Sequence, residues 1–261
     1  MEIFGTFPEN LQKFGVCGYS KAKADELSLK ARWLTNQIPL GLKLKTLYSE
    51  ESGTQGMIEY IPGRYCWRPV DAGGYLFIHC IYVGFKKEYK HQGWGTKLIG
   101  LCEKEAKAGG FSGVAAVTRR SSFMADKELF VKNGFKVIEK CAPDFELIAK
   151  KYNKDAQDPA FNEYAGNVPK RFSKGLYILR SGQCPYTLKN VREMAETAAE
   201  EFGLAPEIVE LETYKDAQKN PSPFGTFSII HDGEVISHHP ISRRRFANIL
   251  SARTVTAAAG T

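Results

Sequence analysis

The segment from Tyr75 to Phe135 constrains the fold of this chain more than any other. The run YLFIHCIYV at 75–83 is apolar, β-branched and aromatic, which predicts a buried strand. After a short basic loop and two glycines, apolar residues recur at the three- and four-residue spacing of one helix face: Leu98, Leu101, Cys102 and Ala106. The first turn of a helix has unpaired backbone N–H groups and partial positive charge. Because Gly93 and Gly95 have no Cβ, a diphosphate could approach the backbone there.

An ordinary turn between a strand and a helix has the same pattern, so this stretch alone leaves both interpretations open. Two further stretches extend it: residues 111–118 predict a second strand, and 130–135 predict the end of a second helix at a glycine. The hexapeptide KHQGWG at 90–95 then resembles the (Arg/Gln)-x-x-Gly-x-(Gly/Ala) signature of the GNAT acetyltransferase superfamily, with lysine in the first place. Residues 129–135 are similar to the Gly-Phe ending that the same family shows after a leucine and an aromatic residue.

This resemblance implies an α/β (α+β) fold with a mixed central sheet and acetyl-CoA as the co-substrate. In the family, backbone N–H groups at the end of the core strand hold the thioester carbonyl, which by position implies Tyr82 and Val83. The diphosphate of the coenzyme is expected over the following loop and helix start: His91, Gln92, Gly93, Trp94, Gly95 and Thr96.

Acetyl transfer also needs a route for the amine proton and for the leaving thiolate. The family often places a tyrosine as general acid where this chain has Phe130, so either another group donates a proton or the thiolate leaves without help. Glu59 and His79 are the candidate bases, because a histidine suits proton abstraction near neutral pH and a glutamate can act through a water. The competing interpretations are a core histidine in an apolar strand and an ion pair of Glu59 with Arg68; some family members use no base.

Upstream of the core strand, the sequence predicts a helix at 22–36 and two strands at 42–49 and 55–62. The aromatic run YCWRPV at 65–70 favours a third strand over a pocket wall. The pieces IEYIPG and WRPV, followed by FIHC at 77–80, resemble the YoaP-type acetyltransferases, which join a GNAT domain to a small C-terminal domain. That resemblance covers nearly the whole chain.

Four segments are therefore predicted: a GNAT domain at 1–152, a polar linker at 153–173, a YoaP-type domain at 174–251 and a flexible tail at 252–261. In the third segment the expected order is strand, helix, strand, hairpin and helix. This order resembles the thioredoxin and glutaredoxin folds, so we expect a small thioredoxin-like α/β domain.

Cys184 stands where glutaredoxins begin their Cys-Pro-Tyr-Cys site, but Thr187 replaces the second cysteine. A dithiol cycle is therefore not expected. A cysteine at a helix start can still have a lowered pKa and react as a monothiol. The alternative is a small residue packed at the start of a helix, and with one cysteine and no partner we favour it.

Composition sets the remaining bounds. The chain has 261 residues and a net charge of +7, which suits anionic ligands such as coenzyme phosphates or nucleic acid alike. The basic residues do not gather in one stretch, so a nucleic-acid partner is not favoured. Six cysteines without a C-x-x-C pair indicate neither a zinc site nor a disulfide framework, and no metal site is expected. With no long apolar run and no signal peptide, we expect no membrane partner and a cytoplasmic location.

We therefore expect an acetyl-CoA-dependent N-acetyltransferase that acts by direct transfer on an amine of a small molecule or peptide. The C-terminal domain would shape the acceptor site or form a homodimer. Two alternatives stay open: a glutaredoxin-like monothiol enzyme that uses Cys184, and a sensor that binds acetyl-CoA without catalysis.

Overall fold

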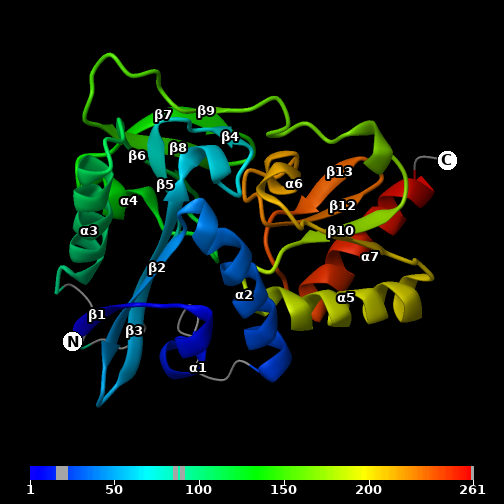
Figure 1. Ribbon diagram of the computed structural model, residues 1–261. Helices are drawn as coiled ribbons and strands as arrows, with labels where there is room; N and C mark the ends of the chain where they lie inside the picture. Colours follow the sequence, from blue (N-terminus) through cyan, green and yellow to red (C-terminus); the bar gives the residue numbers. More distant parts are fainter. Residues whose placement is uncertain (16–22, 85–87, 89–91, 260–261) are drawn as a thin grey trace.

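The N-terminal part of the protein is built on a seven-stranded sheet with the order β1-β2-β3-β5-β6-β8-β7. The computed structural model describes residues 1–15, 23–84, 88 and 92–259. The strands of this sheet are β1 (Glu2–Gly5), β2 (Lys43–Ser49), β3 (Gly53–Pro62), β5 (Tyr75–Val83), β6 (Gly113–Thr118), β7 (Lys136–Cys141) and β8 (Phe145–Lys151). Its helices are α1 (Leu11–Phe14), α2 (Ala24–Gln37), α3 (Trp94–Ala108) and α4 (Lys127–Val131). In Figure 1, α3 and α4 lie together, while α2 lies toward the C-terminal part.

The C-terminal part has a four-stranded sheet with the order β11-β10-β12-β13. Its elements are β10 (Leu176–Arg180), α5 (Tyr186–Phe202), β11 (Glu207–Glu210), α6 (Tyr214–Gln218), β12 (Phe227–His231), β13 (Glu234–Ser237) and α7 (Arg243–Ala259). β10 pairs with β11 in parallel, whereas β10–β12 and β12–β13 are antiparallel. The predicted order of elements is found here, with the short α6 added; the specific likeness to thioredoxin stays a prediction.

The predicted core strand is confirmed as β5, and its edge toward β6 opens partway along. The two strands pair in parallel from Tyr75↔Gly113 to Ile78↔Ala116. Beyond that register β5 stays beside β3 up to Val83, while β6 continues beside β8, so the two strands part. A register shift also occurs between β3 and β5, because Glu59 pairs with Cys80 and the next residue pairs with Ile78. His79 is the residue left over at this bulge, at the point where the gap begins.

Local sequence explains the ends of several elements. Gly93 caps α3 with a φ of 76°, and Gly203 caps α5 with a φ of 63°; both angles lie in the left-handed region that favours glycine. The hairpin β12–β13 turns at Asp232 and Gly233, whose φ values of 48° and 80° are those of a two-residue turn. Ser242 accepts a hydrogen bond from the backbone N–H of Arg245 and so caps α7.

Two expectations are corrected. Residues 65–70 do not form a third strand of the sheet: they follow a short 3₁₀ turn (Gly63–Tyr65) and lead into β4 (Val70–Asp71), which pairs only with β9 (Ala160–Phe161). Proline at 69 and the turn at Gly63 interrupt the extended backbone that a strand needs. Helix α7 also runs to Ala259, into the segment 252–261 where we expected a flexible tail.

The two parts share one apolar core at their junction. A single cluster of buried side chains includes Trp33, Trp67 and Phe77 of the first part and Ile178 and Phe224 of the second. The backbones also approach closely there. A Cβ on Gly225 would lie 2.1 Å from the carbonyl oxygen of Trp67, and one on Gly182 would lie 3.1 Å from that of Leu29. The predicted linker contributes as well, since Phe172 is buried in the same cluster. The exact domain boundaries stay a prediction.

Within the described part of the chain, every helix is too short or too polar to span a bilayer. No three His, Cys, Asp or Glu side chains of the described residues gather as a metal-binding group.

Candidate functional site

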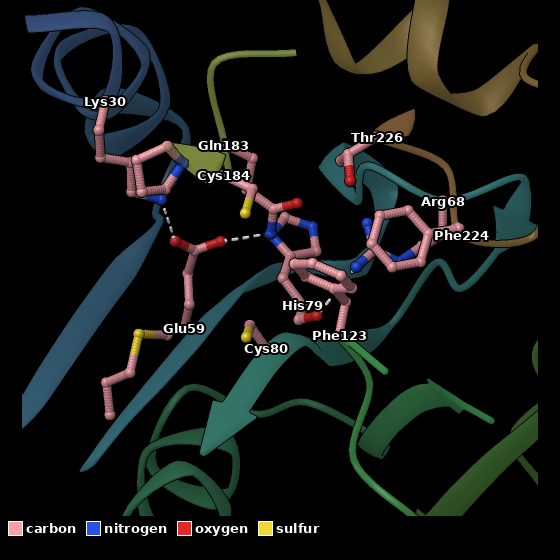
Figure 2. Close-up of a pocket in the computed structure, with 12 residues that line it drawn as sticks. Lys30, Glu59, Arg68, His79, Cys80, Phe123, Gln183, Cys184, Phe224 and Thr226 are labelled. Atoms are coloured by element: carbon pink, nitrogen blue, oxygen red, sulfur yellow. Dashed lines mark hydrogen bonds and ion pairs between the residues drawn. The ribbon is translucent and has the colours of Figure 1, made fainter. Parts of the chain in front are cut away.

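A pocket lies at the junction of the two parts and contains buried charged groups (Figure 2). The first part contributes Lys30 from α2, Glu59 from β3, Arg68 from the loop before β4 and His79 from β5. The second part contributes Gln183 and Cys184 ahead of α5, and Phe224 and Thr226 ahead of β12. Neither part alone would enclose it.

Glu59 is the anion of this pocket, and its partner is Lys30. The two charged atoms lie 2.5 Å apart, and both side chains are 1% exposed. Gln183 donates to the other carboxylate oxygen at 2.7 Å. Burial alone would raise the pKa of Glu59, but the Lys30 ammonium and the contact with His79 outweigh it and lower that pKa to about 2. The anticipated partner Arg68 is not in ion-pair contact with it, so that expectation is replaced by Lys30.

His79 is held in one tautomer. Its Nε2 atom accepts the backbone N–H of Trp67 at 2.9 Å, so the proton of the neutral ring must be on Nδ1, which lies 3.3 Å from Glu59 Oε1. Burial lowers the pKa of His79 to about 4, although the nearby Glu59 acts in the opposite direction. The ring is therefore neutral at physiological pH, and in this arrangement the lone pair that a base would use is occupied by Trp67.

Arg68 is a buried cation whose hydrogen-bond acceptors are uncharged. It is 3% exposed and donates to the backbone oxygens of Trp67, at 2.9 Å, and His79, at 3.0 Å. Burial lowers the pKa of this guanidinium to about 10, which leaves it charged near pH 7. Among the described residues, no carboxylate lies within the 4.0 Å of an ion pair with it.

A second, narrower pocket fills the gap between β5 and β6 and is closed by α4. Ala116 and Val117 of β6 and Phe130 of α4 line it. It shares His79, Cys80 and Phe123 with the junction pocket, so the two hollows meet at the bulge of β5. Phe130 occupies the position where a proton-donating tyrosine was expected. Its ring is buried edge-on against Phe135 and has no acidic proton to donate.

The first turn of α3 lies beyond the open end of this gap. Gln92, Gly93 and Thr96 are exposed there, and the first intrahelical bond runs from Lys97 N–H to Gly93, so the N–H groups just before Lys97 have no partner within the helix. Gly95 also has a packing role, because a Cβ there would lie 2.9 Å from the side chain of Leu129. Close packing of α3 on α4 therefore requires this glycine.

The other anticipated site residues are distributed as follows. Tyr82 and Val83 lie on the part of β5 that has separated from β6. Trp94 begins α3, and its ring nitrogen donates to Gln92 at 3.1 Å. His91 lies outside the described residues. Thr187, which replaces a second cysteine, is buried and donates to the backbone oxygen of Cys184 at 2.9 Å.

The sequence alone did not identify Lys30, Gln183 and Thr226 as residues of the pocket. A signal existed for Lys30, since it falls on the buried face of α2 together with Trp33, Leu34 and Gln37 at helical spacing. No comparable signal marks Gln183 or Thr226, because they reach the pocket only when the two parts pack together.

Comparison with known families matches two regions of the chain. Residues 32–135 match the acetyltransferase (GNAT) family, and residues 207–248 match the YoaP-like family. An uncharacterized N-acetyltransferase of Bacillus subtilis (strain 168), YoaP, is 28% identical over 247 residues, covering 93% of this chain and 96% of that protein.

Several solved acetyltransferases resemble the N-terminal part. The PaiA N-acetyltransferase of Thermoplasma acidophilum, solved with coenzyme A, is 21% identical with a TM-score of 0.39, covering 58% of this chain and 98% of that one. The ribosomal-protein-alanine N-acetyltransferase of Brucella melitensis is 18% identical with a TM-score of 0.42, covering 58% and 99%. The aminoglycoside 6'-N-acetyltransferase of Enterococcus faecium is 14% identical with a TM-score of 0.42, covering 60% and 100%. At these values the three structures add nothing to the argument about the acceptor.

Proposed function

Because the chain is a GNAT-family acetyltransferase and a homologue of the N-acetyltransferase YoaP, we propose that it transfers the acetyl group of acetyl-CoA directly to an amine bound in the junction pocket. The observation that carries this proposal is that the junction pocket and the narrower pocket share His79 and Cys80 as lining residues. One hollow opens along the separated edge of β5, and the other is enclosed by both parts of the chain.

The narrower hollow suits the coenzyme. The diphosphate would be bound by the N–H groups of Gln92 to Thr96 at the positive end of α3. The pantetheine arm would then pass Tyr82 and Val83, whose backbone lies on the open edge of β5, and end near the bulge. Backbone N–H groups along that edge would stabilise the oxyanion of the tetrahedral intermediate.

The junction pocket suits the acceptor, whose nitrogen would attack from the side of Glu59. A carboxylate with a pKa of about 2 is a weak base, and the Nε2 lone pair of His79 is occupied by Trp67. Under this proposal the amine therefore loses its proton to solvent, and coenzyme A leaves as a thiolate. An ordinary thiol pKa near 8.5 makes an unaided departure feasible. The rate constant kcat/KM should rise with pH until the acceptor amine itself is deprotonated.

The predicted general-base roles of His79 and Glu59 can be checked by this pH profile. A break in kcat/KM that stays fixed while acceptors of different pKa are compared would reveal a base on the protein. The role of Cys184 also stays a prediction, although its place on the pocket wall puts it close to the acceptor. Undiminished transfer by Cys184→Ala would remove the thiol-enzyme alternative. A homodimer and a cytoplasmic location are further parts of the prediction, to be checked by ultracentrifugation and cell fractionation.

The first experiment is a calorimetric titration of the protein with acetyl-CoA, followed by an assay of thiol release on a panel of amines. Thr96→Glu is the informative variant, because Thr96 is exposed in the first turn of α3. A carboxylate there favours the helix but repels a diphosphate, so we expect unimpaired folding and binding at least about 10-fold weaker. Thr96→Gln is the neutral control. An intact protein that does not bind acetyl-CoA would overturn the proposal, and binding without transfer to any amine would favour a sensor.

A further inference from the structure

The junction pocket contains more positive than negative charge. Of the described residues that line it, Lys30 and Arg68 are cations, Glu59 is the one anion, and His79 is neutral. Lys30 is already neutralised by Glu59 at 2.5 Å. Among the described residues, Arg68 has no carboxylate within the 4.0 Å of an ion pair, and Glu59 stabilises its charge only from further away.

Such a charge is unusual, because a buried ion is destabilising unless it is paired. Two backbone carbonyls and the ring of Phe224, 5.3 Å away, supply only partial negative charge to Arg68. These contacts fix the guanidinium in place but use only two of its five N–H groups. The arrangement is that of a preformed anion site, with the remaining donors held beside the pocket.

Thr226 provides an independent observation. It is 1% exposed, and its hydroxyl has no hydrogen-bond partner among the described residues. The residue lines the same pocket as Arg68 (Figure 2). Gly225 explains why Thr226 lies near Arg68. Its φ of 74° and the absence of a Cβ allow this loop to pack directly on the backbone of Trp67 and Arg68. A buried hydroxyl group without a hydrogen-bond partner destabilises the protein, and a ligand that forms a hydrogen bond with it removes this cost.

From these two groups we infer that the acceptor is a small amino acid, that is, an amine that also carries a carboxylate. Arg68 and Thr226 bind the carboxylate, and the amine lies toward the bulge of β5, where the two pockets meet. The planar pair of carboxylate oxygens matches the fork of a guanidinium. This inference rests on the proposed function, since it names the acceptor of the same site.

The transfer balances without a further reactant. The deprotonated amine nitrogen attacks the thioester carbonyl carbon, a C–N bond forms, and the C–S bond breaks. The amine proton goes to solvent and coenzyme A leaves with the electron pair of the C–S bond. The products are an N-acetylamino acid and coenzyme A.

Matched acceptors test the inference directly. The panel consists of the common amino acids, the amine that each would give on loss of its carboxylate, and phosphoethanolamine as a phosphate-bearing amine. For the best amino acid we expect kcat/KM at least about 30-fold above that of its decarboxylated counterpart, the effect of a charge-assisted hydrogen bond to a buried group. Equal rates for the two would overturn the inference. A preference for phosphoethanolamine would assign the pocket to phosphate instead, and would overturn the carboxylate.

Two variants locate the effect. Thr226→Val removes the unpartnered hydroxyl at nearly constant shape, so we expect the protein to fold at least as stably. It should lower kcat/KM for the amino acid about 10-fold and leave that for the decarboxylated amine unchanged. Arg68→Met should abolish the preference. Arg64→Met is the control, because Arg64 is exposed outside the pocket and stacks on Tyr65. A preference that survives both pocket variants would overturn the inference.

A binding assay separates this inference from the proposed function. If no amine is acetylated although acetyl-CoA binds, the transfer proposal fails, and amino acids are then titrated calorimetrically into the acetyl-CoA complex. Saturable binding that Thr226→Val weakens would still support a carboxylate site. No binding of any amino acid would overturn that site as well.

Discussion

Two positively charged regions of this molecule, the first turn of α3 and the surroundings of Arg68, differ in how their charge is produced. At α3 the charge comes from backbone N–H groups and Lys97, all at the surface. At Arg68 it comes from one side chain that is 3% exposed and held by two carbonyls. Water and salt reach the first region and weaken its field, whereas the second is shielded from both.

The two kinds of charge would discriminate between ligands to different degrees. An exposed helix start attracts any phosphate and contributes modest affinity, so by itself it distinguishes poorly between phosphate-bearing ligands. A buried guanidinium is destabilising until an anion meets it, so it discriminates strongly between acceptors with and without a charge. Contacts between the two parts of the chain keep Arg68 buried, so variants at those contacts are expected to have the largest effects.

The largest effect is expected for Glu59→Gln. It leaves the ammonium of Lys30, 1% exposed, without a counter-charge, which should lower the free energy of unfolding by about 3 to 5 kcal/mol. Urea unfolding measures the change. The double variant Lys30→Met, Glu59→Gln removes both charges and should recover most of the loss. A single variant as stable as the parent would show that this pair does not hold the pocket together.

Gly225→Ala should follow closely. Its Cβ would lie 2.1 Å from the backbone oxygen of Trp67, at a φ of 74°, so the loop with Thr226 must move away from Arg68. Left-handed strain and overpacking together are expected to cost about 2 to 5 kcal/mol of unfolding free energy. Gly203→Ala is the matched control, because its φ is 63° but a Cβ there meets nothing within 4 Å. It should cost only about 1 to 2 kcal/mol, and equal losses would mean that the contact with Trp67 is unimportant.

Acid should destabilise the buried pocket through His79. Its folded pKa of about 4 lies below the ordinary value of 6.5, so the unfolded chain binds the proton more readily between these values. Stability is therefore fully retained above about pH 6.5 and lost as the pH falls toward 4. Between about pH 7 and pH 5 we expect a loss of about 2 kcal/mol from this residue. Glu59, with its pKa lowered to about 2, adds a loss of the same sign below about pH 4.5.

Urea unfolding at both pH values, with His79→Gln beside the parent, checks this slope. The glutamine oxygen can accept the N–H of Trp67 but does not titrate, so the variant should lose less stability on acidification. His238, whose pKa burial also lowers to about 4, contributes in the same direction and accounts for a remaining slope. An unchanged slope in His79→Gln would show that His79 is not charged on unfolding in this range.

The smallest effect belongs to the exposed region. Lys97→Gln removes a surface charge that lies 4.7 Å from the ring of Trp94, so its effect on unfolding should be below about 0.5 kcal/mol. Acetyl-CoA affinity should fall about 2- to 5-fold at low salt, and the difference should nearly vanish at high salt. Lys104→Gln, exposed further along the same helix, is the control. A Lys97 effect that salt does not weaken would place the coenzyme phosphates in a shielded site.

How much of the site could be foreseen varies with the distance along the chain. The alternation of strand, glycine loop and helix at 75–108 depends on neighbouring residues, and both β5 and α3 are found where the sequence predicts them. The role of Gly95 could not be foreseen, because Leu129, the side chain that it accommodates, is on another helix. The run at 65–70 was misjudged for a related reason: its aromatic residues suit a strand, but the shared core takes Trp67 into a loop instead.

The family signature, the core strand and the glycines at the helix ends can be read from the sequence, since these features depend on local periodicity and backbone freedom. Which charges meet depends on the tertiary structure. Lys30 reaches Glu59 across 29 residues and Gln183 reaches it across 124, and no local pattern encodes such pairs. The proposed anion site at Arg68 likewise arises because the packing of the two parts buries this residue without a carboxylate in ion-pair contact. A buried arginine discriminates between ligands with and without a negative charge more strongly than an arginine at the surface does. Burial is a property of the folded chain.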